Sequence, residues 1–473
     1  MANRLSAPLT KPRIAVLTDI CNEPDDAESL TRFLLYSNEF QIEALIATTS
    51  TWQRTATHKE EIHRILDAYS IVEDTLNVHV PSGKFPTADS LRQVTRSGLD
   101  GYGMEASRGP LCEGTKLLIE AVDKADIIWV LIWGGANVLS QALLEVQRTR
   151  TPDELALFTN KLRVYAISDQ DDAGAWIRLD FPTIFYIASV HAFNMYGLAA
   201  WSGISGESYY GFNPGGPDTS LVAKEWLKEH IQIGPYGKVA YPDPAFIPEG
   251  DTPTFLSLIQ NGLTDPLRPE WGGWGGRYLQ TDPTGASLHY SDAADSVIGK
   301  DGKVHVGNQA TIWRWREAYQ GDFAARMQWT LTKDFASVTH APVVVLNEDT
   351  SLEALRVKVG FGSTLKLDAS KSWSPDEDTE LEFKWMQYRE PSATQWTVGF
   401  EVAELSIADA STNGRFDKVE VSLPGKEDGC VHPLTGGNMP WGEKVYHVIL
   451  EVISKRKYPM RAYRRILIEV KDD

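Results

Sequence analysis

The sequence predicts an α/β fold with a mostly parallel sheet and flanking helices, followed by a smaller all-β, immunoglobulin-like sandwich. From Lys11 to about His340, short apolar runs alternate with helical patterns, and such alternation implies right-handed crossovers between parallel strands. From about Ala341 the pattern changes to alternating strands separated by turn-rich segments. We therefore expect an α/β domain over 1–340 and a β-sandwich over 341–473.

The expected elements of the first domain follow from apolar runs and from helical spacing of apolar residues. The predicted strands are Ile14–Leu17, Ile42–Thr48, Val78–Val80, Ile127–Trp133, Leu162–Ala166 and Thr183–Ile187. The predicted helices are Ala27–Tyr36, His58–Tyr69, Glu113–Lys124 and Gln309–Thr330. From about Trp201 to Gly307 glycine and proline are dense, which predicts long irregular loops of a kind that often carries function.

The second domain is expected to resemble an immunoglobulin-like or PKD-like sandwich. Leu365–Ser370 and Leu381–Trp385 alternate as strands do, with the turn-rich segment Ser374–Asp378 between them. The last strand is expected at about Arg464 to Val470. Trp385 is expected to fill the core of this domain.

Composition excludes several classes of partner. The formal net charge is −18, which argues against nucleic acid and anionic membranes, because phosphate binding needs a positive field. No apolar run reaches the about 18 residues of a membrane span. Cys21, Cys112 and Cys430 are too few and too widely spaced for a zinc pattern or a disulfide framework. Met1–Lys11 lacks an apolar signal core, as expected for a cytosolic protein or for one whose signal has been removed.

The most informative segment lies between the first predicted strand and the first predicted helix. It holds five acidic or amide side chains, which are Asp19, Asn22, Glu23, Asp25 and Asp26. In open α/β sheets ligands bind at this edge, and a high density of oxygen donors suits a hard cation such as calcium. The alternative is a solvated turn in which Asp25 and Asp26 cap the helix.

A second acidic loop follows the predicted strand Leu162–Ala166. Asp169, Asp171 and Asp172 therefore also fall at a sheet edge. Three close carboxylates would raise one another's pKa or recruit a cation, although helix capping is an equal alternative.

Trp271, Trp274 and Arg277 form the third candidate feature, because glycine pairs separate them. Glycine lets the backbone bend sharply and present an indole as a platform for a sugar ring, with Arg277 donating to hydroxyl or carboxylate groups. The alternative is a tight internal turn with buried indoles.

The order of these motifs resembles that of the nucleoside hydrolases. Asp19, Asp25 and Asp26 resemble the family's D-x-D-P-G-x-D-D motif. Phe40–Thr49, Val78–Gly83, Gly101–Gly103 and Trp133–Leu139 resemble, in order, its second strand, its third strand, its glycine pair and its G-P-L-T-N-L-A segment. The match is closer to the nucleoside-hydrolase-like, cellulose-binding family DUF1593. Its expected motifs N-E-P-D-D, W-G-G-W-G-G-R and D-F-A-A-R-M stand here at Asn22–Asp26, Trp271–Arg277 and Asp322–Met327.

The resemblance implies a calcium site and the residues around it. The implied calcium ligands are Asp26, the carbonyl of Ala136, and Asp322. The implied or expected substrate contacts are Asn22, Asn137, Trp271, Trp274 and Arg277, and Asp25 would bind a sugar hydroxyl.

One position departs from the nucleoside hydrolase pattern. Cys21 stands where that family has its general base and second metal ligand, and a thiolate is a poor ligand for a hard cation. A carboxylate is expected to replace it. The candidate catalytic residues are Asp19, Asp25, Asp171 and Asp172, and Asp251 and Glu270 are candidate general acids.

Three functions compete. The first is a glycoside hydrolase with a strand-end, calcium-binding acidic cleft, acting on a carbohydrate or glycoside with inversion. The second is a non-catalytic carbohydrate (cellulose)-binding protein, which Cys21 and the extra sandwich favour. The third is a nucleoside hydrolase, which Cys21 and the Trp-rich loop disfavour. The oligomeric state stays open, a homodimer being one option.

Overall fold

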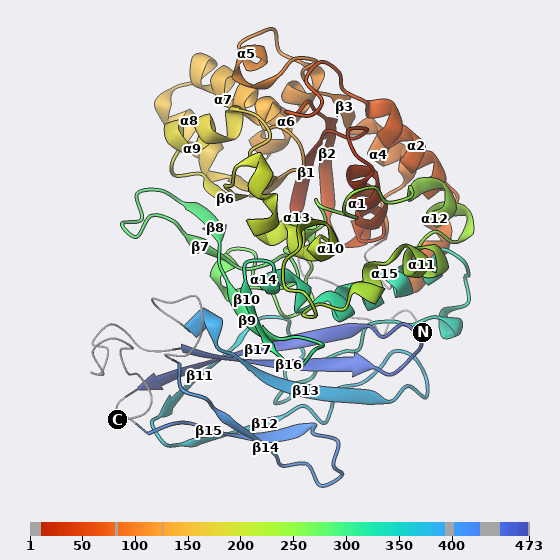
Figure 1. The fold of residues 1–473 in the computed structure, drawn as a ribbon, viewed down its shortest axis with the longest axis vertical. Helices are drawn as coiled ribbons and strands as arrows, with labels where there is room; N and C mark the ends of the chain where they lie inside the picture. The colour runs from red at the N-terminus through yellow and green to blue at the C-terminus, as the bar shows by residue number, and fades with distance from the viewer. Residues whose placement is uncertain (1–10, 81–83, 125, 393–401, 426–444, 472–473) are drawn as a thin grey trace.

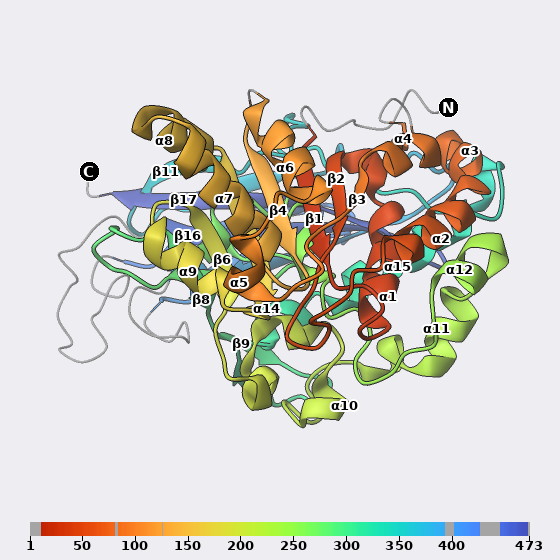
Figure 2. The ribbon, with the colours of Figure 1, turned by 90° about the horizontal axis from the view of Figure 1, so that it is seen from above.

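The computed structural model describes residues 11–471 except 81–83, 125, 393–401 and 426–444. Figure 1 shows an α/β domain above a β-sandwich, and Figure 2 shows the sheet of the α/β domain with helices on both of its faces. This arrangement confirms the predicted fold class. No helix in the described part of the chain is both long and apolar enough to cross a membrane.

The large sheet has the strand order β3-β2-β1-β4-β5-β6-β8-β7. All neighbouring pairs are parallel except β7 and β8. The strands are β1 Arg13–Thr18, β2 Gln41–Ala47, β3 Thr95–Ser97, β4 Ile128–Ile132, β5 Leu162–Ser168, β6 Phe185–Ser189, β7 Tyr278–Gln280 and β8 His289–Asp292. A separate hairpin pairs β9 Asp295–Ile298 with β10 Val304–Gly307.

Two hydrophobic layers sandwich this sheet, because successive side chains of a strand point to opposite faces. Ile14 and Val16 of β1 belong to one buried cluster, and Ala15 and Leu17 belong to the other. The helices that build the two layers and the surrounding loops are α1 Asp25–Leu34, α2 Lys59–Ser70, α3 Glu73–Leu76, α4 Ala88–Gln93, α5 Gly103–Ser107, α6 Glu113–Asp123, α7 Asn137–Thr149, α8 Pro152–Asn160, α9 Ala173–Asp180, α10 Glu207–Tyr210, α11 Lys224–His230, α12 Gly234–Ala240, α13 Pro253–Leu256, α14 Ala310–Trp313 and α15 Arg316–Trp329.

One predicted strand is wrong. Val78–Val80 does not join the sheet, because Asn77–His79 is a 3-10 helix and the edge position belongs to β3. The ring of His79 is buried in a stack with Trp329 and His340. A short apolar run is equally compatible with a strand and with such a packed turn, so periodicity could not separate the two.

The C-terminal domain packs two sheets face to face. One has the order β11-β17-β16-β13 and the other β12-β15-β14. Their strands are β11 Leu355–Gly360, β12 Thr364–Asp368, β13 Leu381–Tyr388, β14 Ser406–Asp409, β15 Lys418–Ser422, β16 Val445–Ser454 and β17 Arg461–Lys471. Trp385 lies in the core between the two sheets, as expected.

The two domains share a hydrophobic core. Tyr388 and Tyr463 of the sandwich belong to the same buried cluster as Trp274 and Trp315 of the α/β domain. Trp315 packs edge-on against both tyrosines, with ring centroids 5.9 and 6.1 Å apart. The Tyr388 hydroxyl also donates to the fully buried carboxylate of Asp295, at 2.6 Å. The sandwich therefore covers apolar surface of the first domain.

Candidate functional site

Four aspartates gather where β1 ends and α1 begins, and we call them the acidic cluster. Asp19 directly follows β1, Asp25 and Asp26 open α1, and Asp251 comes from a loop far along the chain. Carboxylate oxygens of Asp25, Asp26 and Asp251 lie within 4.8 Å of one another. The Thr18 hydroxyl donates to Asp26. The N-cap residue of α1 is Pro24, which makes no side-chain cap bond. Capping of α1 does not account for Asp251, which comes from another part of the chain.

Contacts to α1 place Asp251 in this cluster. The guanidinium of Arg32 donates to the Glu249 carboxylate at 2.7 Å, and Glu28 accepts from the Glu249 N–H at 2.9 Å. Both Arg32 and Glu28 are fully buried. Removing one partner of a buried ion pair is strongly destabilising, so the loop that carries Asp251 is fixed on α1.

The four carboxylates repel one another in a buried setting. Burial raises the pKa of Asp19 to about 6 and that of Asp25 to about 8, and Glu23 adds to both shifts. Burial and the neighbouring aspartates hold the pKa values of Asp26 and Asp251 well above their usual range. No cationic side chain is among the main causes of these shifts. The negative charge of the cluster is therefore uncompensated by the described residues.

The rim of the cluster is open to solvent and its backbone is strained. Asn22, Glu23 and Asp25 are half-buried and Cys21 is exposed. Cys21 and Glu249 have φ angles of 81° and 59°, a region that residues with a side chain seldom adopt. Such strain is found preferentially at functional sites.

A divalent cation fits these donors. Oδ2 of Asp19 and Oδ2 of Asp251 are buried and have no hydrogen-bond partner. A buried polar atom without a partner carries the full cost of its desolvation. The donor atoms are all oxygen, which suits calcium better than a transition metal.

Asp322 is wrong as the late metal ligand. Its Oδ1 accepts from the Tyr36 hydroxyl at 2.6 Å and from Arg326 Nε at 2.8 Å. Asp251 takes the expected place beside Asp25 and Asp26. From the sequence, Asp251 was predicted only as a candidate general acid. The one sequence feature that could have suggested a metal ligand is its position after Glu249-Gly250 in the loop-rich stretch.

Asp171 and Asp172 are not among the three carboxylates that lie within 4.8 Å of one another, and their catalytic role stays a prediction. Asp171 accepts from the N–H groups of Asn137 and Ala173, at 3.1 and 2.9 Å. Asp172 accepts from the Met104 N–H at 2.8 Å. Both side chains satisfy backbone donors at the ends of β4, β5 and neighbouring helices, which is the capping alternative.

Asn137 is also wrong as a substrate contact. Its side chain is fully buried, and its amide donates to Thr49 Oγ1 and to the Gly101 carbonyl, both at 2.9 Å. The carbonyl of Ala136 accepts from the Ser140 N–H at 3.0 Å, so its contact to a metal stays a prediction. The N–H of Asn22 donates to the Asp19 carbonyl at 3.1 Å, and the role of its side chain also stays a prediction.

Trp271, Trp274 and Arg277 belong to the domain interface, so their prediction as sugar contacts is wrong. Trp271 is 6% and Trp274 is 1% exposed, and Trp274 Nε1 donates to the Tyr463 hydroxyl at 3.3 Å. Arg277 is paired with the buried Asp295 at 2.7 Å. The lack of a side chain at Gly272 leaves room for Tyr388, because a Cβ there would lie 2.4 Å from the Tyr388 hydroxyl. The tight internal turn was the correct alternative.

The fold and the strand-end carboxylates define the class of nucleoside-hydrolase-like α/β proteins. Residues 13–278 match the family model described as "Cellulose-binding Sde182, nucleoside hydrolase-like domain", and residues 364–470 match "Cellulose-binding protein Sde0182, C-terminal domain". The chain belongs to this cellulose-binding Sde182 family, which confirms the resemblance found in its motifs.

The chain is also similar to solved structures. The chain is 30% identical to a nucleoside hydrolase-related hypothetical protein from Saccharophagus degradans that is associated with carbohydrate metabolism; the match covers 98% of this chain and 100% of that chain, with a TM-score of 0.76. The effector XOO4466 and the type III effector XopQ are each 12% identical over 69% of this chain and over 95% and 96% of theirs, with TM-scores of 0.34 and 0.35. No curated protein matches the chain.

Proposed function

We propose that the protein binds a neutral carbohydrate at the acidic cluster, together with a divalent cation that its oxygen donors suit, namely calcium. The observation that carries the proposal is the convergence of Asp25, Asp26 and Asp251 within 4.8 Å, with a buried, unpartnered oxygen on Asp251. The cellulose-binding description of the family and the carbohydrate association of the Saccharophagus protein support the choice of ligand.

Different residues of the cluster would bind the cation and the sugar. Asp26 and Asp251 are buried and would hold the cation with Asp25. A bound calcium ion would neutralise these carboxylates and accept oxygen ligands from a sugar. Asn22 and Glu23, half-buried at the rim, would then exchange hydrogen bonds with sugar hydroxyls.

We expect the cation-free protein to lose stability as pH rises from about 4 to about 8. Asp19 and Asp25 have pKa values of about 6 and about 8 in the fold, against 3.8 ordinarily. The folded state thus holds protons that the unfolded chain has released, so the free energy of unfolding falls across this window. Calcium should remove the fall, because it stabilises the ionised carboxylates.

Thermal unfolding between pH 4 and pH 8.5, with either a chelator or calcium, measures this effect. The difference in melting temperature between the two conditions should grow with pH. A difference that is absent, or that shrinks with rising pH, would contradict the cation.

Hydrolysis is a second candidate function, favoured by one observation. Asp19 is 1% exposed, its Oδ2 is unpartnered, and burial raises its pKa to about 6, close to the value that suits a general base near neutral pH. The hydrolysis hypothesis also needs a general acid, and both candidates for it have other partners. Asp251 lies in the cation cluster, and Glu270 accepts from Arg268 Nε at 2.5 Å. Binding is therefore the leading proposal, and inversion stays a prediction.

If a glycoside is hydrolysed, Asp19→Asn should lower the rate by about two to four orders of magnitude, the usual effect of losing a general base. Cys21→Ser should change it far less, because partial desolvation of the thiol and the nearby carboxylates of Glu61, Glu60 and Asp26 raise the pKa of Cys21 to about 11. The thiol is then protonated at neutral pH. Initial rates on aryl glycosides, with Asp172→Asn as a matched carboxylate control, measure the difference. Activity that survives Asp19→Asn and is lost in Cys21→Ser would make the thiol the catalyst.

A further inference from the structure

A continuous series of aromatic rings crosses the loops beside the acidic cluster. Consecutive ring centroids lie 5.0 to 6.4 Å apart. In order, the rings belong to Trp52, Phe193, Tyr196, Trp201, Tyr210, Tyr209 and Phe246. We call this set the aromatic series. All its members except Trp52 come from the stretch 193–246, and the fold brings Trp52 next to Phe193.

The middle of the aromatic series lies against the acidic cluster. A Cβ on Gly250 would lie 2.7 Å from Asp25 Oδ2 and 3.4 Å from the Trp201 ring, so the carboxylate and the ring both lie close to Gly250. Burial and the carboxylates of Glu23 and Asp25 raise the pKa of Tyr210. The Trp52 end also lies near the cluster, because the Gln53 amide beside it donates to the Asp19 carbonyl at 3.3 Å.

The ends of the aromatic series are open to solvent. Trp52 and Phe193 at one end are 53% and 43% exposed, and Tyr209 and Phe246 at the other are 57% and 61% exposed. No other aromatic side chain in the described part of the chain is as exposed. Each end therefore presents a pair of exposed aromatic rings, and exposed apolar surface can mark an interaction site. The ring of Trp201 between the two pairs is buried.

The backbone holds one of these rings in an unfavourable conformation. Phe246 has a φ angle of 59°, which is uncommon for a bulky residue. Its ring is mostly exposed, so burial of the side chain does not offset the strain. Strain of this kind at an exposed position points to a ligand contact.

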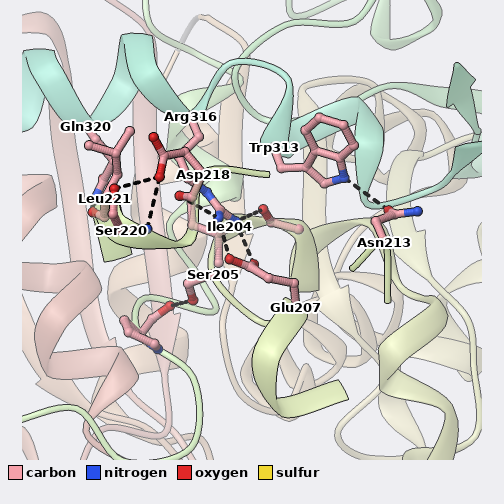
Figure 3. Close-up of polar contacts among 12 residues, drawn as sticks. Ile204, Ser205, Glu207, Asn213, Asp218, Ser220, Leu221, Trp313, Arg316 and Gln320 are labelled. Carbon is pink, nitrogen blue, oxygen red and sulfur yellow. Dashed lines mark hydrogen bonds and ion pairs between the residues drawn. The ribbon is translucent and has the colours of Figure 1, made fainter. Parts of the chain in front are cut away.

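Buried polar contacts fix the segment that carries the middle of the aromatic series, as Figure 3 shows. Arg316 of α15 pairs with Glu207 of α10 and donates to the Gly203 carbonyl at 3.0 Å. Trp313 Nε1 donates to Asn213 Oδ1 at 3.1 Å. Arg316 is 1% and Glu207 is 6% exposed. The rings are thus presented by an anchored surface, which keeps the ordering cost of binding low.

We infer that the aromatic series is the binding platform for an unbranched, neutral oligosaccharide that passes across the acidic cluster and stacks on exposed rings at both ends. A pyranose ring offers an apolar C–H face to an aromatic ring and hydroxyls to carboxylates, which is the pairing found here. Exposed rings at both ends require several sugar units. A second copy of this chain, with a net charge of −18, would bring like charges together. This inference rests on the proposed function and adds the chain length of its ligand.

The test compares a short and a long ligand, cellobiose and cellohexaose, by isothermal titration calorimetry with calcium present. Trp52→Ala and Phe246→Ala should each weaken cellohexaose binding about tenfold, the value of one stacked ring, and should leave cellobiose binding unchanged. Leu157→Ala on α8, a 64% exposed apolar residue outside the series, is the matched control and should bind both sugars as the unaltered chain does.

The outcomes separate the inference from the proposed function. If the unaltered chain binds neither sugar, the proposed function fails and the inference with it. If cellohexaose binding is the same in both variants and in the unaltered chain, the platform is wrong while the proposed function stands. If the variants instead change the sedimentation coefficient of the ligand-free protein, the exposed rings serve self-association, and the inference is overturned.

Discussion

Asp251→Asn should weaken calcium binding by at least about 100-fold, more than is usual for the loss of an outer-shell partner. The change removes one of the three carboxylates that lie within 4.8 Å of one another, and calcium affinity depends on the number of charged ligands. Asp251 is 1% exposed and its Oδ2 has no protein partner, so the amide should fit the same space. Isothermal titration of metal-stripped protein measures the loss.

Asp322→Asn is the matched control for Asp251→Asn. Asp322 was the ligand that the motif D-F-A-A-R-M implied, but its carboxylate accepts from Tyr36 and Arg326. The variant should keep the calcium affinity of the unaltered chain. Its melting temperature should fall, because breaking a buried ion pair costs about 3–5 kcal/mol. Calcium binding that survives Asp251→Asn and is lost in Asp322→Asn would restore the original assignment.

Truncation near His340 should leave the α/β domain insoluble. Without the sandwich, Trp274 and Trp315 lose Tyr388 and Tyr463, their partners in the shared core. An apolar patch exposed in this way promotes aggregation. The soluble fraction after expression, compared between the truncated and full-length chains, measures the effect.

Tyr463 allows a graded version of the same experiment in the full-length chain. The residue is fully buried, and its hydroxyl donates to Glu451 at 3.0 Å. Tyr463→Ala should lower the free energy of unfolding by about 3–5 kcal/mol. Tyr463→Phe removes two hydrogen bonds, the one to Glu451 and the one from Trp274 Nε1, and should cost about 2 kcal/mol. A soluble, stable truncated chain and a silent Tyr463→Ala would show that the two domains are independent.

Most of the fold could be predicted from the sequence because its strands are buried on both sides. Ile14–Leu17, Leu162–Ala166 and Ile42–Thr48 each lie within two residues of an observed strand, since parallel strands covered on both faces are apolar at most positions. Val78–Val80 failed because three apolar or neutral residues fit a packed 3-10 turn equally well.

The candidate site was predicted only where its residues are local in sequence. Asp19, Asp25 and Asp26 could be placed because a strand end and a helix start fix them directly. The position of Asp251 depends on Arg32 and on other α1 contacts more than 200 residues away, and no local pattern contains that information. Trp271 and Trp274 were misassigned because the same sequence pattern, a tryptophan flanked by glycines, occurs both in binding loops and in domain interfaces. Their neighbours in space, which decide between the two, come from the second domain.

If the proposed carbohydrate ligand is part of a solid polymer, the shared core of the two domains constrains how the chain attaches to it. Modules joined by a flexible linker gain avidity, because one bound module keeps the other at a high effective concentration. Here the Tyr388 hydroxyl donates to Asp295, and Arg465 donates to the Gly272 carbonyl at 2.9 Å. These bonds hold the sandwich in a fixed position relative to the α/β domain. A second contact made by the sandwich would have one fixed orientation relative to the first. The gain in avidity would then depend on the spacing of sugar chains on the polymer surface and not on the length of a linker.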